Sequence, residues 1–305
     1  MPIVPTDVPM TSQLLGETIL ALTQRYPTLR AGILTQTAFR RPVQTLSFGR
    51  GPRKVIYSAA HHANEWITTP VILKFMEELA DAAEQDTEIF GIPAREIEEK
   101  VTIHTVPMVD PDGVDLVTGA LQPGDPSYES AARLASFYPQ IPFPDGWKAN
   151  LLGVDLNLNY PAGWLRAREI KFSQGFTRPG PRDYVGRAPL NQNKTLALAL
   201  FTQEVDPDLI LAYHSQGQVI YWQFDDIFVP GARELGERLA AVSGYTLDET
   251  PAQSAYAGYK DWFIQEFRRP GYTVEVGLGE NPLPISQFDE IYRDNLGILV
   301  TAALG

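Results

Sequence analysis

Residues 59–68 read AAHHANEWIT and directly follow the apolar run of residues 55–57. That run predicts a buried strand over residues 54–58, and the apolar positions after Trp66 predict a helix that continues to about residue 83. Between these two elements the chain places His62 and Glu65, which carry two of the side chains that proteins use to bind metals. The segment therefore predicts a strand, a polar turn and a helix, with a candidate metal-binding pair in the turn.

The rest of the sequence continues this alternation of strands and helices. Strands are expected over residues 42–48, 101–106, 209–213, 218–222 and 272–276, and helices over residues 12–26, 190–205, 230–242, 258–268 and after Pro284. Such alternation predicts an α/β fold, here a single-domain α/β/α sandwich around a mixed, mostly parallel, twisted sheet. In these folds functional sites lie beyond the carboxyl ends of the strands, so a site is expected at that edge.

A long segment interrupts this regular pattern. A turn is expected from Asp110 to Gly113, and residues 119–188 are then rich in proline, glycine and aromatic residues with little periodicity. Long irregular stretches within a compact domain are usually functional or disordered. Aromatic residues such as Tyr128 and Trp147 argue against disorder, so an ordered functional region is expected.

Composition narrows the classes of partner and chemistry. The chain has 305 residues and a formal net charge of −12, which argues against nucleic acid as the main partner because phosphate binding requires a basic surface. It has no cysteine, so histidine and carboxylate side chains would have to bind any metal. No apolar run is long enough to span a membrane, and the first residues lack the pattern of a secretory signal. A cytoplasmic protein without a membrane partner is expected.

One region is basic despite the acidic balance of the chain. Between residues 166 and 187 only two residues are acidic, and six are basic, namely Arg166, Arg168, Lys171, Arg178, Arg182 and Arg187. An ordinary solvated loop would account for this pattern, and so would a surface that binds carboxylates. The sequence leaves both interpretations open.

Two further strand ends carry residues suited to metal-dependent chemistry. His214 follows the expected strand of residues 209–213, and with His62 and Glu65 it completes the His₂Glu set of catalytic zinc sites. Glu275 interrupts the apolar run of the last expected strand, where a charge is costly unless it is used or paired. A carboxylate at this position would suit a general base that takes a proton from water. The pattern predicts one zinc ion per chain.

The segments HANEW, GVDLNLNY, HSQG and TVEVG occur in this order and resemble the motifs of the zinc metallocarboxypeptidases, which share the fold of carboxypeptidase A. The resemblance runs from about residue 26 to the C-terminus. It implies that His62, Glu65 and His214 bind zinc and that Glu275 is the general base. It also implies that Asp155 in GVD orients the first ligand histidine and fixes its tautomer.

The same resemblance extends to residues that would contact the substrate. Lys148 in GWKAN lies where the family usually has an arginine that stabilises the oxyanion, and lysine can supply that charge as a single donor group. Tyr256 resembles the mobile tyrosine that closes over substrate, although its spacing from the following motif is shorter. Asn157, which follows GVD, is expected to contact the substrate.

Two departures from the family pattern point to a subgroup. Carboxypeptidases of the family read Asn-Arg-Asn after GVD, and that arginine binds the terminal carboxylate, but this chain has Leu158 there and Asn64 in place of a second common arginine. The segments HANEWITTPV, PMVDPDGVDLV and NPLPISQFDEIY resemble the bacterial γ-D-glutamyl-L-diamino acid endopeptidases. These cleave the γ-D-glutamyl bond to meso-diaminopimelate or lysine in peptidoglycan stem peptides. The resemblance implies a peptidoglycan-derived peptide as substrate, with Arg166 and Arg182 as candidates for binding its carboxylates.

Three alternatives remain beside this interpretation. The chain would also suit an ordinary metallocarboxypeptidase with a relocated carboxylate clamp, a related N-acyl amino acid deacylase, or an inactive module that binds stem peptides. A binding module needs neither the zinc ligands nor Glu275 and Asp155, so their presence argues against it. One catalytic domain over residues 1–305 is expected, without an appended cell-wall-binding repeat.

Overall fold

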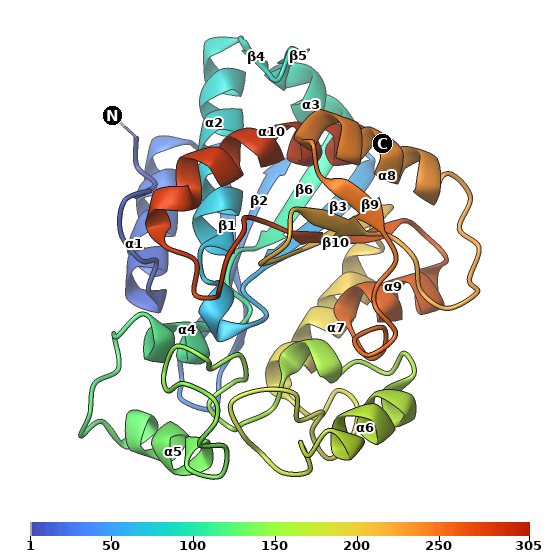
Figure 1. Cartoon of the computed structure of the whole chain (residues 1–305). Helices are drawn as coiled ribbons and strands as arrows, with labels where there is room; N and C mark the ends of the chain where they lie inside the picture. Colours follow the sequence, from blue (N-terminus) through green and yellow to red (C-terminus); the bar gives the residue numbers. More distant parts are fainter. Residues whose placement is uncertain (1) are drawn as a thin grey trace.

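The computed structural model describes residues 2–305, and in it an eight-stranded sheet lies between two layers of helices (Figure 1). The strands of this sheet are β1 (Arg30–Gln36), β2 (Pro42–Gly49), β3 (Arg53–Ala59), β6 (Val101–Val106), β7 (Leu209–His214), β8 (Val219–Tyr221), β9 (Thr246–Asp248) and β10 (Gly271–Glu275). Their order is β1-β2-β6-β3-β7-β10-β8-β9. The four central strands β6, β3, β7 and β10 are parallel, whereas β2 and β8 pair with them antiparallel. The predicted mixed α/β sheet is confirmed.

Helices cover both faces of this sheet. One layer contains α1 (Ser12–Arg25), α2 (Thr68–Gln85), α3 (Ala94–Lys100), α8 (Ala232–Ser243) and α10 (Phe288–Leu304), and the other contains α7 (Asn193–Val205) and α9 (Tyr259–Phe267). Side chains of β7 alternate between the layers, because Leu209 and Leu211 pack in the first core and Ile210 and Ala212 in the second. Burial on both faces explains why the central strands read as continuous apolar runs.

The parallel centre of the sheet brings three strand ends to one edge. Ala59 at the end of β3 pairs with Tyr213, and Glu275 at the end of β10 pairs with His214 at the end of β7. His62 follows β3 directly, at the start of the short 3₁₀ helix η1 (Ala63–Glu65). The carboxyl-end edge therefore holds the predicted metal ligands at the ends of β3 and β7, with the predicted general base Glu275 on the adjacent β10.

The irregular region contains more regular structure than its sequence indicates. It includes α5 (Pro126–Ala135), η2 (Leu156–Leu158) and α6 (Trp164–Ser173). The turn predicted at Asp110 is wrong, because α4 (Pro111–Val117) begins there. The Asp110 side chain accepts a hydrogen bond from the amide of Gly113, and Pro111 occupies the first helical position, so these turn-forming residues start a helix.

The remaining elements are short and lie at the edges of the fold. A two-stranded hairpin joins β4 (Glu88–Ile89) to β5 (Ile92–Pro93), and η3 (Ile285–Gln287) precedes α10. The sequence did not predict β1, β9 or α3. Within residues 2–305 there is no helix with both the length and the apolar character needed to cross a membrane.

Candidate active site

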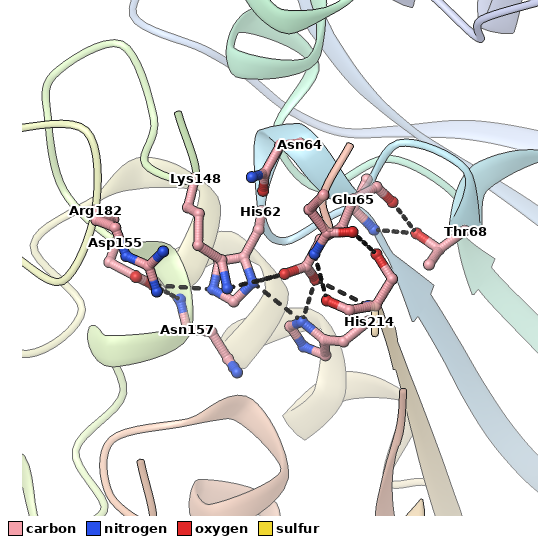
Figure 2. Close-up of polar contacts among 12 residues, drawn as sticks. His62, Asn64, Glu65, Thr68, Lys148, Asp155, Asn157, Arg182 and His214 are labelled. Carbon is pink, nitrogen blue, oxygen red and sulfur yellow. Dashed lines mark hydrogen bonds and ion pairs between the residues drawn. The ribbon is translucent and has the colours of Figure 1, made fainter. Parts of the chain in front are cut away.

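His62, Glu65 and His214 converge at the carboxyl-end edge of the sheet (Figure 2). Nδ1 of His62 lies 2.9 Å from one carboxylate oxygen of Glu65, and Nδ1 of His214 lies 2.8 Å from the other. The two Nδ1 atoms are 3.2 Å apart, and all three side chains are buried. One ligand atom from each residue lies within 4.8 Å of the others, so the structure brings the three predicted ligands together.

The donor atoms of this group suit a cation. Nε2 of His62 lies 3.1 Å from a carboxylate oxygen of Asp155, and with the proton assigned to Nε2 the ring directs an unprotonated Nδ1 at the group. That lone pair faces the Glu65 carboxylate and the Nδ1 of His214, an arrangement of acceptors that a cation would stabilise. Two imidazole nitrogens and a carboxylate are the ligands of catalytic zinc sites, so the residues present fit zinc.

Charges in the group support the same assignment. Burial would lower the pKa of His62, but the Glu65 carboxylate and then Asp155 raise it, to about 9, so a cation that binds here would replace a proton on Nδ1. Burial would raise the pKa of Glu65, but His62 and Lys148 hold it well below its usual range. Glu65 is therefore an anion at neutral pH, in a buried position where a divalent cation would be attracted.

His61, the neighbouring histidine, has a different place. Its ring stacks on His214 and on Tyr259, with centroids 5.6 Å apart in each pair, and its Nε2 lies 3.3 Å from the hydroxyl of Tyr160. Burial holds the pKa of His61 well below its usual value, so the ring is neutral. His61 therefore packs behind His214 and lies outside the metal-binding group.

Two further charged residues flank the group. Glu275 lies beside His214 across the parallel pair, and burial followed by the charge of Glu65 raises its pKa to about 8. Nζ of Lys148 lies 3.0 Å from a carboxylate oxygen of Glu65, and the Lys148 carbonyl accepts a hydrogen bond from the Ala63 amide. The main chain thus holds Lys148 against the turn that carries the ligands.

Two cavities meet at this site. The first, of about 220 Å³, is lined in part by His62 and His214, and the second, of about 840 Å³, lies along Asn64 and Ser215. Four residues line both cavities, namely Lys148, Arg182, Tyr221 and Glu275. A substrate can therefore extend to both sides of the metal-binding group.

Asn157 and Arg182, two of the predicted substrate-binding residues, line the first cavity. The Asn157 side-chain oxygen accepts a hydrogen bond from the Tyr259 amide, which fixes its orientation between η2 and α9. Arg182 lies beside Asp155 in Figure 2, and its Nε donates to Asp183 at 2.6 Å. Both residues are in a position to meet a substrate.

The other two predicted substrate-binding residues lie elsewhere. Arg166 is exposed on α6, where it forms an ion pair with Glu169 at 3.7 Å, and it is not among the described residues that line either cavity. The Tyr256 ring packs edge-on against Phe224 and borders Gly163, outside the two cavities formed by the described residues. The structure does not bring these two side chains to the site, and the closing role of Tyr256 stays a prediction.

Sequence reasoning missed a second set of charges that line the first cavity. These residues are Asp183, Lys260 and Asp261, and Lys171 joins them from the basic region. Lys260 and Asp261 are buried among the aromatic residues of α9. A charged pair inside an aromatic run is itself a signal, because buried charges are rare unless they are paired or used.

A buried His₂Glu group and a further carboxylate, Glu275, at the same edge of an α/β sandwich are the parts of a zinc-dependent hydrolase. Residues 16–297 match the family described as zinc carboxypeptidase, and the chain belongs to that family. It is 42% identical over 285 residues to γ-D-glutamyl-L-diamino acid endopeptidase 1 of Lysinibacillus sphaericus, a match that covers 92% of this chain and 69% of that protein. The protein is a zinc metallopeptidase.

Solved structures show the same fold at low sequence identity. The structure of thrombin-activatable fibrinolysis inhibitor matches with a TM-score of 0.76 at 16% identity, over 100% of this chain and 76% of that one. The murein-tripeptide amidase of Escherichia coli O157 matches with a TM-score of 0.55 at 18% identity, over 89% of this chain and 91% of that one. The predicted fold is thereby confirmed.

Proposed function

We propose that this protein is a zinc-dependent endopeptidase that hydrolyses the bond between γ-D-glutamate and a diamino acid, meso-diaminopimelate or lysine, in peptidoglycan-derived peptides. The observation that carries the proposal is the likeness to the Lysinibacillus enzyme over nearly the whole chain. The first cavity supports it, because the apolar Leu158 lines this cavity where carboxypeptidases of the family have the arginine that binds a terminal carboxylate.

In this proposal His62, Glu65 and His214 hold the zinc ion. Zinc bound there would supply a Lewis acid that polarises the scissile carbonyl and makes a water molecule more acidic. Asp155 accepts a hydrogen bond from the Nε2–H group of His62 and so keeps Nδ1 free for the metal. The ligands, Asp155 and Glu275 come from segments across residues 62–275, which supports one catalytic domain.

Glu275 would transfer the proton, and Lys148 would stabilise the charge that develops during the reaction. Glu275 takes a proton from the attacking water and passes it to the leaving amine, a role that its position beside His214 permits. The ammonium of Lys148, which lies beside the metal-binding carboxylate, stabilises the negative charge that develops on the carbonyl oxygen.

The substrate would occupy both cavities. The γ-D-glutamyl side has a free α-carboxylate at the far end of its side chain from the scissile bond, and Arg182, which lines both cavities, is in a position to meet it. The diamino acid would then lie in the first cavity, with Asn157 and Leu158 on its wall. A substrate held on both sides of the bond suits an endopeptidase.

Metal binding gives the first test of these roles. Replacing His62 or His214 with alanine is expected to remove most of the zinc from the purified protein, because an open site then keeps only two protein ligands. Asp155→Asn should retain zinc but bind it about 10- to 100-fold more weakly, since it loses the charge that orients His62. Metal analysis and competition with a chelator measure both effects. Full zinc occupancy in both histidine variants would contradict the ligand set.

Substrate preference tests the proposed reaction. We expect the kcat/KM for L-Ala-γ-D-Glu-meso-diaminopimelate to exceed that for N-blocked dipeptides ending in phenylalanine or lysine by at least about tenfold, the effect of one or two charge-assisted contacts. Product formation is followed by mass spectrometry under matched conditions. Similar values for the two classes of substrate would instead indicate an ordinary carboxypeptidase with a relocated clamp.

A further inference from the structure

A buried pair of opposite charges lines the first cavity at the start of α9. Lys260 and Asp261 are each only 3% exposed, and both border the cavity that also reaches His62. Nζ of Lys260 lies 2.6 Å from Oδ1 of Asp261 and donates to the carbonyl oxygen of Gln223. The pair therefore belongs to the wall of the substrate cavity, on a different element from the metal ligands.

Both members of this pair have hydrogen-bonding capacity left. The lysine ammonium has three donor hydrogens, and two of them are directed at Gln223 and Asp261. Oδ2 of Asp261 accepts from the Gly258 amide at 3.1 Å, whereas the buried Oδ1 has only the ion pair with Lys260 among the described residues and keeps a lone pair for a second donor. The cavity wall thus offers one donor and one acceptor side by side.

Other charged groups of the cavity are held by partners of opposite charge. Asp183 binds both Lys171, at 2.7 Å, and Arg182, at 2.6 Å, and Lys148 is held by the metal-binding carboxylate. The Lys260–Asp261 pair is instead one cation against one anion, with no net charge. A ligand that carries both charges can bind it without leaving either buried charge uncompensated.

We propose that Lys260 and Asp261 form the subsite for the distal amino acid head of diaminopimelate, with its carboxylate on Lys260 and its ammonium on Asp261. This inference rests on the proposed function and adds to it a preference between the two diamino acids. Lysine ends in an ammonium alone, which would meet Asp261 but would also face the charge of Lys260. The pair therefore favours diaminopimelate over lysine.

Three peptides that differ only at the far end of the third residue test this subsite. They share L-Ala-γ-D-Glu and continue with meso-diaminopimelate, with lysine, or with 2-aminopimelate, which has the carboxylate but no distal ammonium. The wild-type protein with zinc should cleave the diaminopimelate peptide with a kcat/KM at least about tenfold above either of the others. This comparison requires no variant, so it does not depend on how a substitution affects folding.

Two substitutions assign the two charges. Lys260→Met should lower the preference for diaminopimelate over lysine by at least about tenfold, because only the carboxylate contact is lost. Asp261→Asn keeps an oxygen for the Gly258 amide and should lower the preference for diaminopimelate over 2-aminopimelate by a similar factor. Ratios between peptides are independent of the fraction of active protein.

Lys194→Met is the matched control. Lys194 is also a buried lysine paired with an aspartate, Asp110, but it lies outside the cavities formed by the described residues. Its replacement should leave both ratios unchanged even if stability falls. Equal cleavage of the three peptides by the wild-type protein would overturn the subsite and leave the proposed function intact. Cleavage of none of them at the γ-D-glutamyl bond would instead show that the proposed function is wrong.

Discussion

Glu275→Gln is expected to slow turnover at least about 100-fold while the zinc content and KM stay close to those of the wild type. Glutamine keeps the size of the side chain at the end of β10, beside His214, but it cannot accept the proton of the attacking water. The loss should therefore appear in kcat. Steady-state kinetics with the diaminopimelate peptide, together with metal analysis, measure it.

The pH profile and a control variant sharpen this prediction. Burial and then Glu65 raise the pKa of Glu275 to about 8, and a bound cation would lower it. Because the base must be ionised, kcat/KM should fall as the pH drops through this lowered pKa. Glu280→Gln removes a carboxylate that lines only the second cavity, so it should leave turnover near normal. Near-normal turnover of Glu275→Gln would mean that another group accepts the proton.

Lys148→Met is expected to lower kcat by about 10²- to 10³-fold, the usual effect of removing a group that stabilises a developing oxyanion. Its ammonium lies 3.0 Å from the Glu65 carboxylate, close to the metal-binding group, and its main chain is tied to Ala63. Methionine keeps most of the length of the side chain and removes the charge. Single-turnover kinetics on zinc-loaded protein report the chemical step directly.

Lys148→Arg provides the matched control, because it keeps a cation of similar reach. We expect it to retain much more activity than Lys148→Met. Zinc content must be measured for both variants, since Lys148 also compensates the charge of Glu65. A methionine variant with full zinc and wild-type kcat would exclude Lys148 from oxyanion stabilisation.

The metal-binding group could be predicted from the sequence because buried parallel strands have a recognisable apolar pattern and end at the same edge of the sheet. Continuous apolar runs identify buried strands, and polar residues that follow such runs lie at the carboxyl-end edge. His62 and His214 each follow a run of this kind, and Glu275 ends another. The family motifs then select these residues from all other pairs of histidine and glutamate.

The walls of the cavities could not be predicted in the same way. Lys260 and Asp261 reach the site only because α9 begins beside η2, where Asn157 accepts a hydrogen bond from the Tyr259 amide. Arg166 belongs to the same basic region as Arg182 but lies on an exposed face of α6, and nothing in the local sequence distinguishes the two. Tertiary packing decides which charges of such a region face the substrate.

Helices in the proline-rich region were missed for a related reason. Proline after aspartate is typical both of turns and of helix starts, and Asp110 and Asp125 each cap a helix whose first residue is proline. Whether such a segment forms a turn or a helix depends on its burial. Here α4 packs against η1, so the segment after Asp110 is helical and supports the ligand-bearing segment that contains Glu65.

The most direct measurement is the bond that the zinc-loaded protein cleaves in L-Ala-γ-D-Glu-meso-diaminopimelate-D-Ala. An endopeptidase would cleave the bond between γ-D-glutamate and diaminopimelate, and a carboxypeptidase would release D-alanine. The masses of the products distinguish these two activities. We expect L-Ala-D-Glu and meso-diaminopimelate-D-Ala, formed by the zinc-loaded protein and lost when the zinc is removed. Release of D-alanine alone would contradict the endopeptidase assignment and identify a carboxypeptidase.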